Sequence, residues 1–136
     1  MKIDDTALEF QEAIDYFKGK VNLPTKAWTD VWEEQHTKAF VIAGATKTAM
    51  LEDFRGAIAK AIESGTTLEE FRKDFDQIVT KHGWTYKGKR GWRTRVIFET
   101  NLRTAHAAGR WDQIERVKKI RPYLQYIAVD DERTRR

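Results

Sequence analysis

The chain has 136 residues, enough for one domain but short for two, and its 40% of hydrophobic residues predicts a folded protein. It has no Cys, which excludes disulfides, thiolate metal sites and thiol nucleophiles and is typical of an intracellular protein. The net charge is +4, no signal peptide is visible, and no apolar run reaches the roughly 18 residues of a membrane helix. We therefore expect a soluble protein without a membrane partner.

Two helices are predicted in the first third of the chain. Thr6 and Glu9 have the spacing of a capping box, and apolar residues recur every three or four positions as far as residue 18. The first helix is therefore predicted over 6–18. Trp28 stands where a hydrophobic staple would precede a second helix, predicted from residue 29 or 30 to about 42.

The next two helices have stronger signals. An apolar stripe at helical spacing predicts a helix over 48–64, with Gly65 as its C-cap. Thr67 and Glu70 have the spacing of a second capping box, and the helix that they open is predicted to end at Gly83. The stripe of the first of these helices consists of Leu51, Phe54, Ile58 and Ile62.

The last third predicts a loop or loose hairpin over 84–91, the longest helix from about 92 to 119, and a β-strand over 123–129, "YLQYIAV". A single strand has unpaired backbone groups. Either 84–88 pairs with it, or a partner strand lies beyond residue 136 and the chain is cut short. The fold class expected is a mainly α single domain over 1–136: a bundle of about five helices with a long C-terminal helix and a small β element near the C-terminus.

The middle of the long helix, 98–113, is rich in small and polar residues where Leu and Ile would be usual. Thr100 and Thr104 share one face, with Asn101 and Ala105 on the adjacent strip. Small residues in this pattern let another backbone approach closely, and a buried Asn101 would need hydrogen-bond partners. This face is predicted to form a docking groove for a neighbouring irregular segment.

The charge is unevenly distributed, with a basic C-terminal part. Residues 1–83 hold 11 Lys and Arg against 15 Asp and Glu (−4), whereas 84–136 hold 14 against 6 (+8). This asymmetry is typical either of a surface that meets an anionic partner or of a solvated basic surface. The residues predicted to contact nucleic acid are Lys87, Lys89, Arg90, Arg93 and Arg95.

Aromatic residues alternate with this basic cluster. Trp84, Tyr86 and Trp92 could stack on the bases of a single strand. The alternative, which we favour, is that Trp84 and Trp92 anchor the ends of the loop in the core.

Catalytic patterns are weak. Glu99, His106 and Arg110 share a helix face with Arg103 and could serve a nuclease, but a row of i,i+4 ion pairs is the favoured interpretation. The three His lack zinc-ligand spacing, and the acidic pair at Asp130 is better explained as a solvated turn than as a metal site. We expect no enzyme, no catalytic residue, no metal, no cofactor and no small-molecule substrate.

Two segments together resemble the phage Mu F-like minor head protein family, also called phage head morphogenesis proteins. They are "TNLRTAHAAGRWDQ" (100–113) and "RPYLQYIAVDDERTR" (121–135), and 39–75 and 82–84 are similar to the family as well. The motif residues are Thr100, Asn101, Thr104, Ala105, Gly109, Arg110, Arg121, Pro122, Tyr123, Asp130, Arg133 and Thr134.

The resemblance implies a structural role in a virion. Family members are minor head proteins that associate with the portal during procapsid assembly, and some are thought to contact DNA during packaging or ejection. The partners implied are the portal protein and other head proteins, with DNA as a further candidate, in the virion or the bacterial host cytoplasm. In the family the last turn continues into a Pro, a His and a short strand, which have no counterpart here, in line with an expected truncation.

Overall fold

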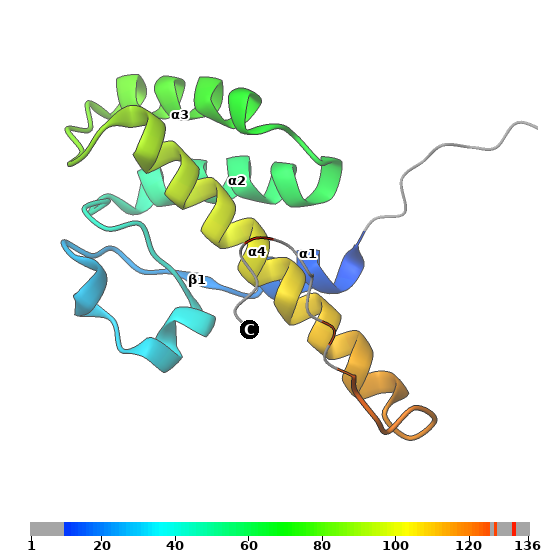
Figure 1. Cartoon of the computed structure of the whole chain (residues 1–136). Helices are drawn as coiled ribbons and strands as arrows, with labels where there is room; N and C mark the ends of the chain where they lie inside the picture. The colour runs from blue at the N-terminus through cyan, green and yellow to red at the C-terminus, as the bar shows by residue number, and fades with distance from the viewer. Residues whose placement is uncertain (1–9, 126, 128–131, 133–136) are drawn as a thin grey trace, which may run out of the picture.

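The computed structural model describes residues 10–125, 127 and 132. Four α-helices dominate the described residues, and Figure 1 shows the longest, α4, crossing the others. The elements in order are α1 (Gln11–Lys18), β1 (Val21–Asn22), the 3₁₀ helices η1 (Trp28–Asp30) and η2 (Glu33–Thr37), β2 (Ala39–Phe40), α2 (Thr48–Ser64), α3 (Leu68–His82) and α4 (Arg90–Val117).

Helices α2 and α3 form where their sequence signals place them. The Thr67 hydroxyl accepts from the Glu70 amide at 3.3 Å, and the Glu70 carboxylate accepts from the Thr67 amide at 2.8 Å. Gly65 and Gly83 end α2 and α3 in the left-handed conformation, with φ of 65° and 61°. The capping box and both C-caps are therefore confirmed.

One hydrophobic core joins all four helices. Phe54 of α2 and Phe75 of α3 are fully buried, with ring centroids 5.6 Å apart, and Phe71 packs against Phe98 of α4. Phe17 of α1 and Phe40 of β2 extend the same core toward the N-terminal region. Helix α4 therefore contacts α2 and α3 with its first half and α1 with its second half (Figure 1).

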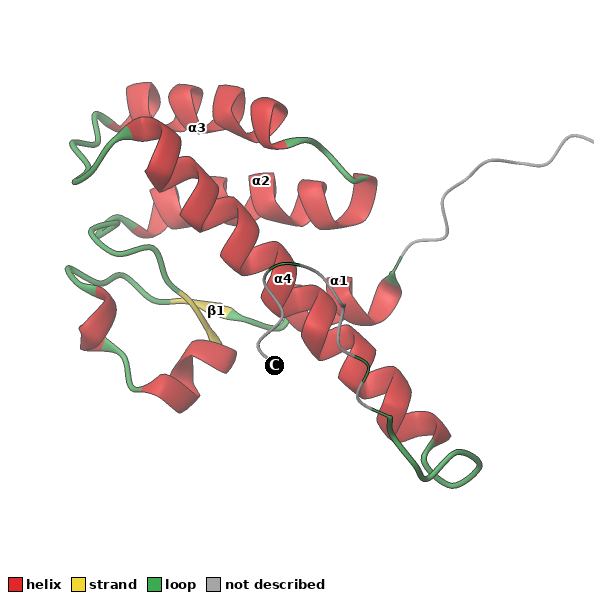
Figure 2. Cartoon of the chain, viewed as in Figure 1, coloured by secondary structure: helices red, strands yellow, loops and turns green. Residues whose placement is uncertain are grey.

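The helix predicted over 29–42 is wrong. The structure has η1, η2 and β2 there, with β2 pairing in parallel with β1 as the small yellow sheet of Figure 2. The Asp30 carboxylate accepts from the backbone amides of Lys26 and Ala27, both at 2.9 Å, which closes a turn before a helix can begin. The apolar residues at 40–42 are buried at three consecutive positions. This pattern suits a short strand better than one face of a helix.

The ends of the chain also differ from expectation. The described helices number four, α1 begins at Gln11, and the capping box predicted at residues 6 and 9 lies outside the described residues. Residues 121–125 and 127 form no strand, and 84–88 does not pair with them. The helix ends in a turn, because the amides of Ile120 and Arg121 both donate to the Val117 carbonyl. The described β structure therefore lies in the N-terminal half, not near the C-terminus.

Candidate functional site

The small-residue face of α4 does receive a close neighbour, which is helix α1. A Cβ on Gly109 would lie 2.7 Å from the backbone nitrogen of Ala13 and 3.1 Å from its Cα. Ala105 is fully buried one turn earlier. Close packing at this face is therefore confirmed, but the neighbour is a regular helix and not the irregular segment expected.

The other half of that face borders an open groove. Thr100, Asn101 and Thr104 line a hollow of about 480 Å³ between α4 and residues 36–43, which we call the α4–β2 groove. The Thr104 hydroxyl donates to the Thr100 carbonyl at 2.7 Å, and the Asn101 amide donates to the Ile97 carbonyl at 2.8 Å. Asn101 is only partly buried and finds its hydrogen-bond partner within α4 itself.

The α4–β2 groove is apolar with two cationic side chains in its walls. Val41, Ile42 and Ile97 are buried along it, and Trp92 and Val96 remain exposed. Other lining residues are Lys20, Trp28, His36, Ala39, Ala43 and Arg93. This lining suits an apolar segment better than a small charged ligand.

The two cations in the groove are held by the protein itself. The Lys20 ammonium donates to the His36 carbonyl at 3.1 Å, and the Arg93 guanidinium donates to the Ala43 carbonyl. Burial lowers the pKa of both Lys20 and Arg93, since the charged form loses solvation. Each of these side chains therefore links two separate segments of the chain through a hydrogen bond.

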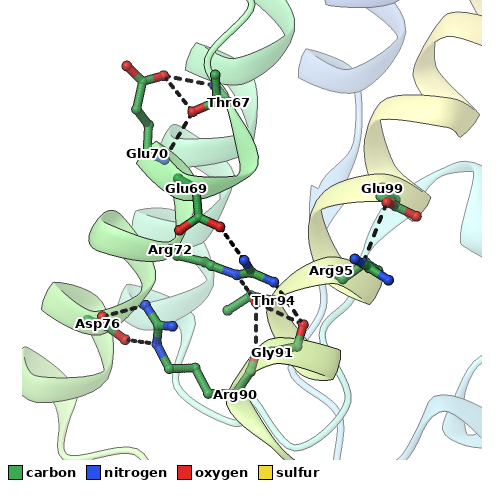
Figure 3. A network of polar contacts seen from close by, with 10 residues as sticks. All are labelled: Thr67, Glu69, Glu70, Arg72, Asp76, Arg90, Gly91, Thr94, Arg95 and Glu99. Atoms are coloured by element: carbon green, nitrogen blue, oxygen red, sulfur yellow. Dashed lines mark hydrogen bonds and ion pairs between the residues drawn. The ribbon is translucent and has the colours of Figure 1, made fainter.

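On the helix face that could serve a nuclease, Glu99 forms ion pairs, whereas His106 packs against an aromatic ring. Glu99 lies 3.9 Å from Arg95 and 3.4 Å from Arg103, on the outer surface of α4 (Arg95 and Glu99 in Figure 3). The His106 ring contacts Phe10, with centroids 5.6 Å apart, and Arg110 is exposed. No group of three or more acidic or His residues among the described positions could hold a metal. The arrangement offers no nucleophile or paired acid and base.

Most of the basic cluster is engaged within the chain. Arg90 donates two 2.8 Å hydrogen bonds to Asp76, which lower the pKa of that carboxyl (Figure 3). Arg93 contacts the Trp84 ring, at 5.4 Å from its centroid, besides Ala43. In the part of the chain that the structure describes, the Lys87 and Lys89 side chains have no such partner and are exposed.

The two Trp that flank this loop differ. The Trp84 ring packs on Phe54 and Phe75, and its indole N–H donates to the Gly44 carbonyl at 3.2 Å. It anchors the loop, as favoured from the sequence. Trp92 is exposed beside the groove, so the same prediction is wrong for it.

A polar network that the sequence did not reveal fixes the start of α4. The Arg72 guanidinium donates to the buried Thr94 hydroxyl at 3.1 Å and to the Gly91 carbonyl at 3.3 Å (Figure 3). Arg72 lies on α3, so the network joins α3 to the first turn of α4 and sets the position of the basic loop. The sequence gives no local sign of this network, because the buried Thr94 and its partner Arg72 lie on different helices.

The remaining motif residues follow α4. Arg121, Pro122 and Tyr123 are exposed in the loop after the helix, whereas Asp130, Arg133 and Thr134 lie outside the described residues. No described helix is both long and apolar enough to cross a membrane.

Comparison with known proteins gives two relatives. The chain is 33% identical to a capsid assembly protein F of Escherichia phage Mu over 139 aligned positions, 92% of this chain and 32% of that protein. It is 36% identical to the Mu-like prophage FluMu F protein of Haemophilus influenzae, over 79% of this chain and 28% of that protein. The chain belongs to the Mu F-like family. It spans about a third of the length of these Mu F-like relatives.

The other two comparisons are empty. No family model matches the chain, and no solved structure matches it. The family resemblance seen in the sequence motifs is therefore confirmed, and the evidence for it is the sequence identity with the two F proteins.

Proposed function

We propose that this chain is the part of a Mu F-like protein that binds other head proteins during assembly of a phage or prophage capsid, with the portal protein as its main partner. The observation that carries the proposal is the match to the Mu capsid assembly protein F over 92% of the chain. The arrangement of the described residues supports it, since it offers a packed helical body and exposed apolar side chains but no catalytic set. Support of DNA packaging or ejection would follow from a position at the portal.

The arm formed by η1 and η2 is the surface that we assign to this contact. Trp32 is 82% exposed, and acidic Glu33 and Glu34 follow it. Exposed Trp side chains that become buried are frequent hot spots of protein interfaces. Trp28 stacks on His36 at 3.8 Å between centroids, which holds the arm in one shape before any partner binds.

Co-purification with the portal protein of the same phage tests the proposal. Co-elution that survives about 1 M salt is expected, because charge contacts are screened over roughly 3 Å at that ionic strength and apolar contacts are not. Trp32→Ala should weaken the association at least tenfold, whereas Trp111→Ala, on the exposed side of α4, should leave it unchanged. Absence of co-elution at any salt concentration would overturn the portal assignment.

A second candidate function, contact with DNA, is favoured by the free lysines of the basic loop. If only Lys87 and Lys89 contact phosphates of a duplex, the DNA-binding constant should fall as the salt concentration rises. A plot of its logarithm against the logarithm of the salt concentration should then have a slope of about −1.8. A slope of about −4.5 would mean that Arg90, Arg93 and Arg95 bind as well. Replacing both lysines with Gln should abolish binding at about 50 mM salt, and Lys26→Gln on the N-terminal side is the matched control. Absence of binding by the unaltered chain at that salt would end this candidate.

A further inference from the structure

The lining of the α4–β2 groove contains cationic side chains but no acidic one. Lys20, Arg93 and the ring of His36 line it, whereas none of the 21 Asp and Glu residues of the chain does. Charges that are taken out of water in a folded protein are ordinarily paired with an opposite charge. The groove therefore carries positive charge that no side chain of its own walls neutralises.

These two cations differ from others that link elements of the fold. Arg90, for example, pairs with the Asp76 carboxylate of α3 at 2.8 Å. Lys20 and Arg93 instead donate to backbone carbonyls, and in the described part of the chain neither forms an ion pair with a carboxylate. The Nε of Arg93 is also buried without a hydrogen-bond partner there. An incoming carboxylate would offset the solvation that both charges have lost.

Lys20 and Arg93 lie toward opposite ends of one wall of the groove. Lys20 directly precedes β1, whose Val21 pairs with Ala39 at the start of β2. Arg93 donates to the carbonyl of Ala43, four residues further along the same wall. Four residues span at most about 13 Å at roughly 3.3 Å per residue. A stretch of wall about four residues long therefore separates the two positive ends.

The stretch between the two cations is apolar. Val41, Ile42 and Ile97 are buried along it, while Trp92 and Trp28 remain 59% and 52% exposed. Large aromatic side chains beside an apolar hollow are frequent hot spots once a partner covers them. Because the hydrogen bonds of both cations hold the walls in place, the groove is formed before any partner binds, which lowers the entropic cost of binding.

We propose that the α4–β2 groove binds a short extended segment of a partner protein in which two acidic residues flank an apolar side chain. The apolar side chain covers Ile42 and Ile97, one carboxylate contacts the Arg93 guanidinium, and the other approaches Lys20. Charge complementarity selects such a segment, and the apolar floor excludes a uniformly charged one. The contact is separate from the one assigned to Trp32, which does not line the groove, and does not depend on the portal as the partner.

Peptide probes test the charge requirement on the unaltered chain. The first probe, Ser-Glu-Thr-Leu-Thr-Glu-Ser with blocked ends, places both Glu and the Leu on one face of an extended chain. In the second probe Gln replaces both Glu. Titration with the first probe at about 50 mM salt should change the amide chemical shifts of Ala39, Val41 and Ile97. It should bind at least roughly tenfold more tightly than the second, and equal affinities would overturn the proposal.

Substitutions of Val96 separate charge from fit. Val96 lines the groove and is 40% exposed, so its replacement leaves the core intact. Val96→Glu offers Arg93, three residues earlier on α4, a carboxylate of the chain itself and should weaken the first probe at least about tenfold. Val96→Lys, of similar length and opposite charge, should retain the binding. Val117→Glu, exposed at the end of the same helix, is the matched control and should also retain it. Equal losses in the Glu and Lys variants at position 96 would contradict the role of charge.

Three results of the same titrations would assign the groove to a different occupant and overturn the proposal. Shift changes at Trp32 without changes at Ala39 would place the probe on the arm. Changes at Ala39 and Ile97 that appear when the chain alone is concentrated would mean that a second copy fills the groove. Changes at these amides with a single-stranded oligonucleotide, but not with the first probe, would mean that a nucleic acid fills it.

Discussion

Replacement of Gly109 by Ala tests how closely α1 and α4 approach each other. In an isolated helix Ala is more favourable than Gly by about 1 kcal/mol, so propensity alone predicts a more stable protein. Here the added methyl would stand 2.7 Å from the Ala13 nitrogen and 2.9 Å from the Phe10 ring. Ala13 presents backbone atoms that cannot rotate away, so α1 has to shift.

The clash is expected to outweigh the gain in helix propensity. Overpacking of a tight interface costs about 1–3 kcal/mol, and backbone atoms at such distances place this site in the upper half of that range. After the gain of about 1 kcal/mol in helix propensity, we expect Gly109→Ala to lower the free energy of unfolding by about 1–2 kcal/mol. For a domain of this size that is roughly 4–7 °C in melting temperature. Urea unfolding followed by far-UV circular dichroism measures the change.

Gly56→Ala is the matched control. Gly56 lies in the middle of α2 and is exposed, and a methyl group added there would meet no atom within 4 Å. The same chemical change should therefore stabilise the protein by about 0.5–1 kcal/mol. If Gly109→Ala were as stabilising as Gly56→Ala, the close contact between α1 and α4 would be refuted.

Three further predictions concern stability. Ala105→Phe should lower the free energy of unfolding by about 1–3 kcal/mol, because the site is already filled. Thr67→Ala removes the capping box with Glu70 and should cost about 1 kcal/mol. The hydrogen bond from His82 to Asp53, at 2.6 Å, lowers the pKa of that carboxyl with help from Lys81. Its contribution is present above the unfolded pKa of about 3.9 and is lost as the pH falls through the lower folded pKa, so Asp53→Asn should destabilise at pH 6 and cost progressively less below about pH 4.

Neighbouring residues supply the controls for these predictions. Thr66→Ala, one residue before the cap, should leave stability within about 0.5 kcal/mol. Asp74→Asn, whose carboxylate has no hydrogen bond within the described chain, should leave stability within about 0.5 kcal/mol. Equal effects of Thr66→Ala and Thr67→Ala in urea unfolding would contradict the capping argument, and a pH-independent effect of Asp53→Asn would contradict the linkage argument.

The sequence was sufficient for helices whose signals are local. Thr67, Glu70 and Gly83 lie within or beside the helix that they delimit, so α3 could be predicted to within one residue. The segment 29–42 could not, because its structure depends on the pairing of Ala39 with Val21, eighteen positions earlier. A hydrophobic pattern does not specify such a partner, and the short run of apolar residues suits a helix or a strand equally.

The candidate surfaces show the same limit. Small residues at Ala105 and Gly109 correctly indicated a close approach, but their periodicity did not identify α1 as the neighbour. The basic cluster was visible as composition, yet Arg90 pairs with Asp76 on another helix and is not available as a free cation. Charge in a sequence counts both free and paired groups, and only the fold separates them.

The contact at Gly109 and the α4–β2 groove are mechanically connected. Lys20 follows α1 by two residues, is buried, and donates to the His36 carbonyl, which belongs to η2 directly before β2. The position of α1 on α4 therefore sets the position of Lys20, and through it the wall of the groove opposite α4. A shift of α1 caused by Gly109→Ala should change the surroundings of Ala39 and Val41. Gly56→Ala, on the far side of α2, should leave their surroundings unchanged. Chemical-shift changes at Ala39 in the first variant alone would link the docking of α1 to the wall of the α4–β2 groove.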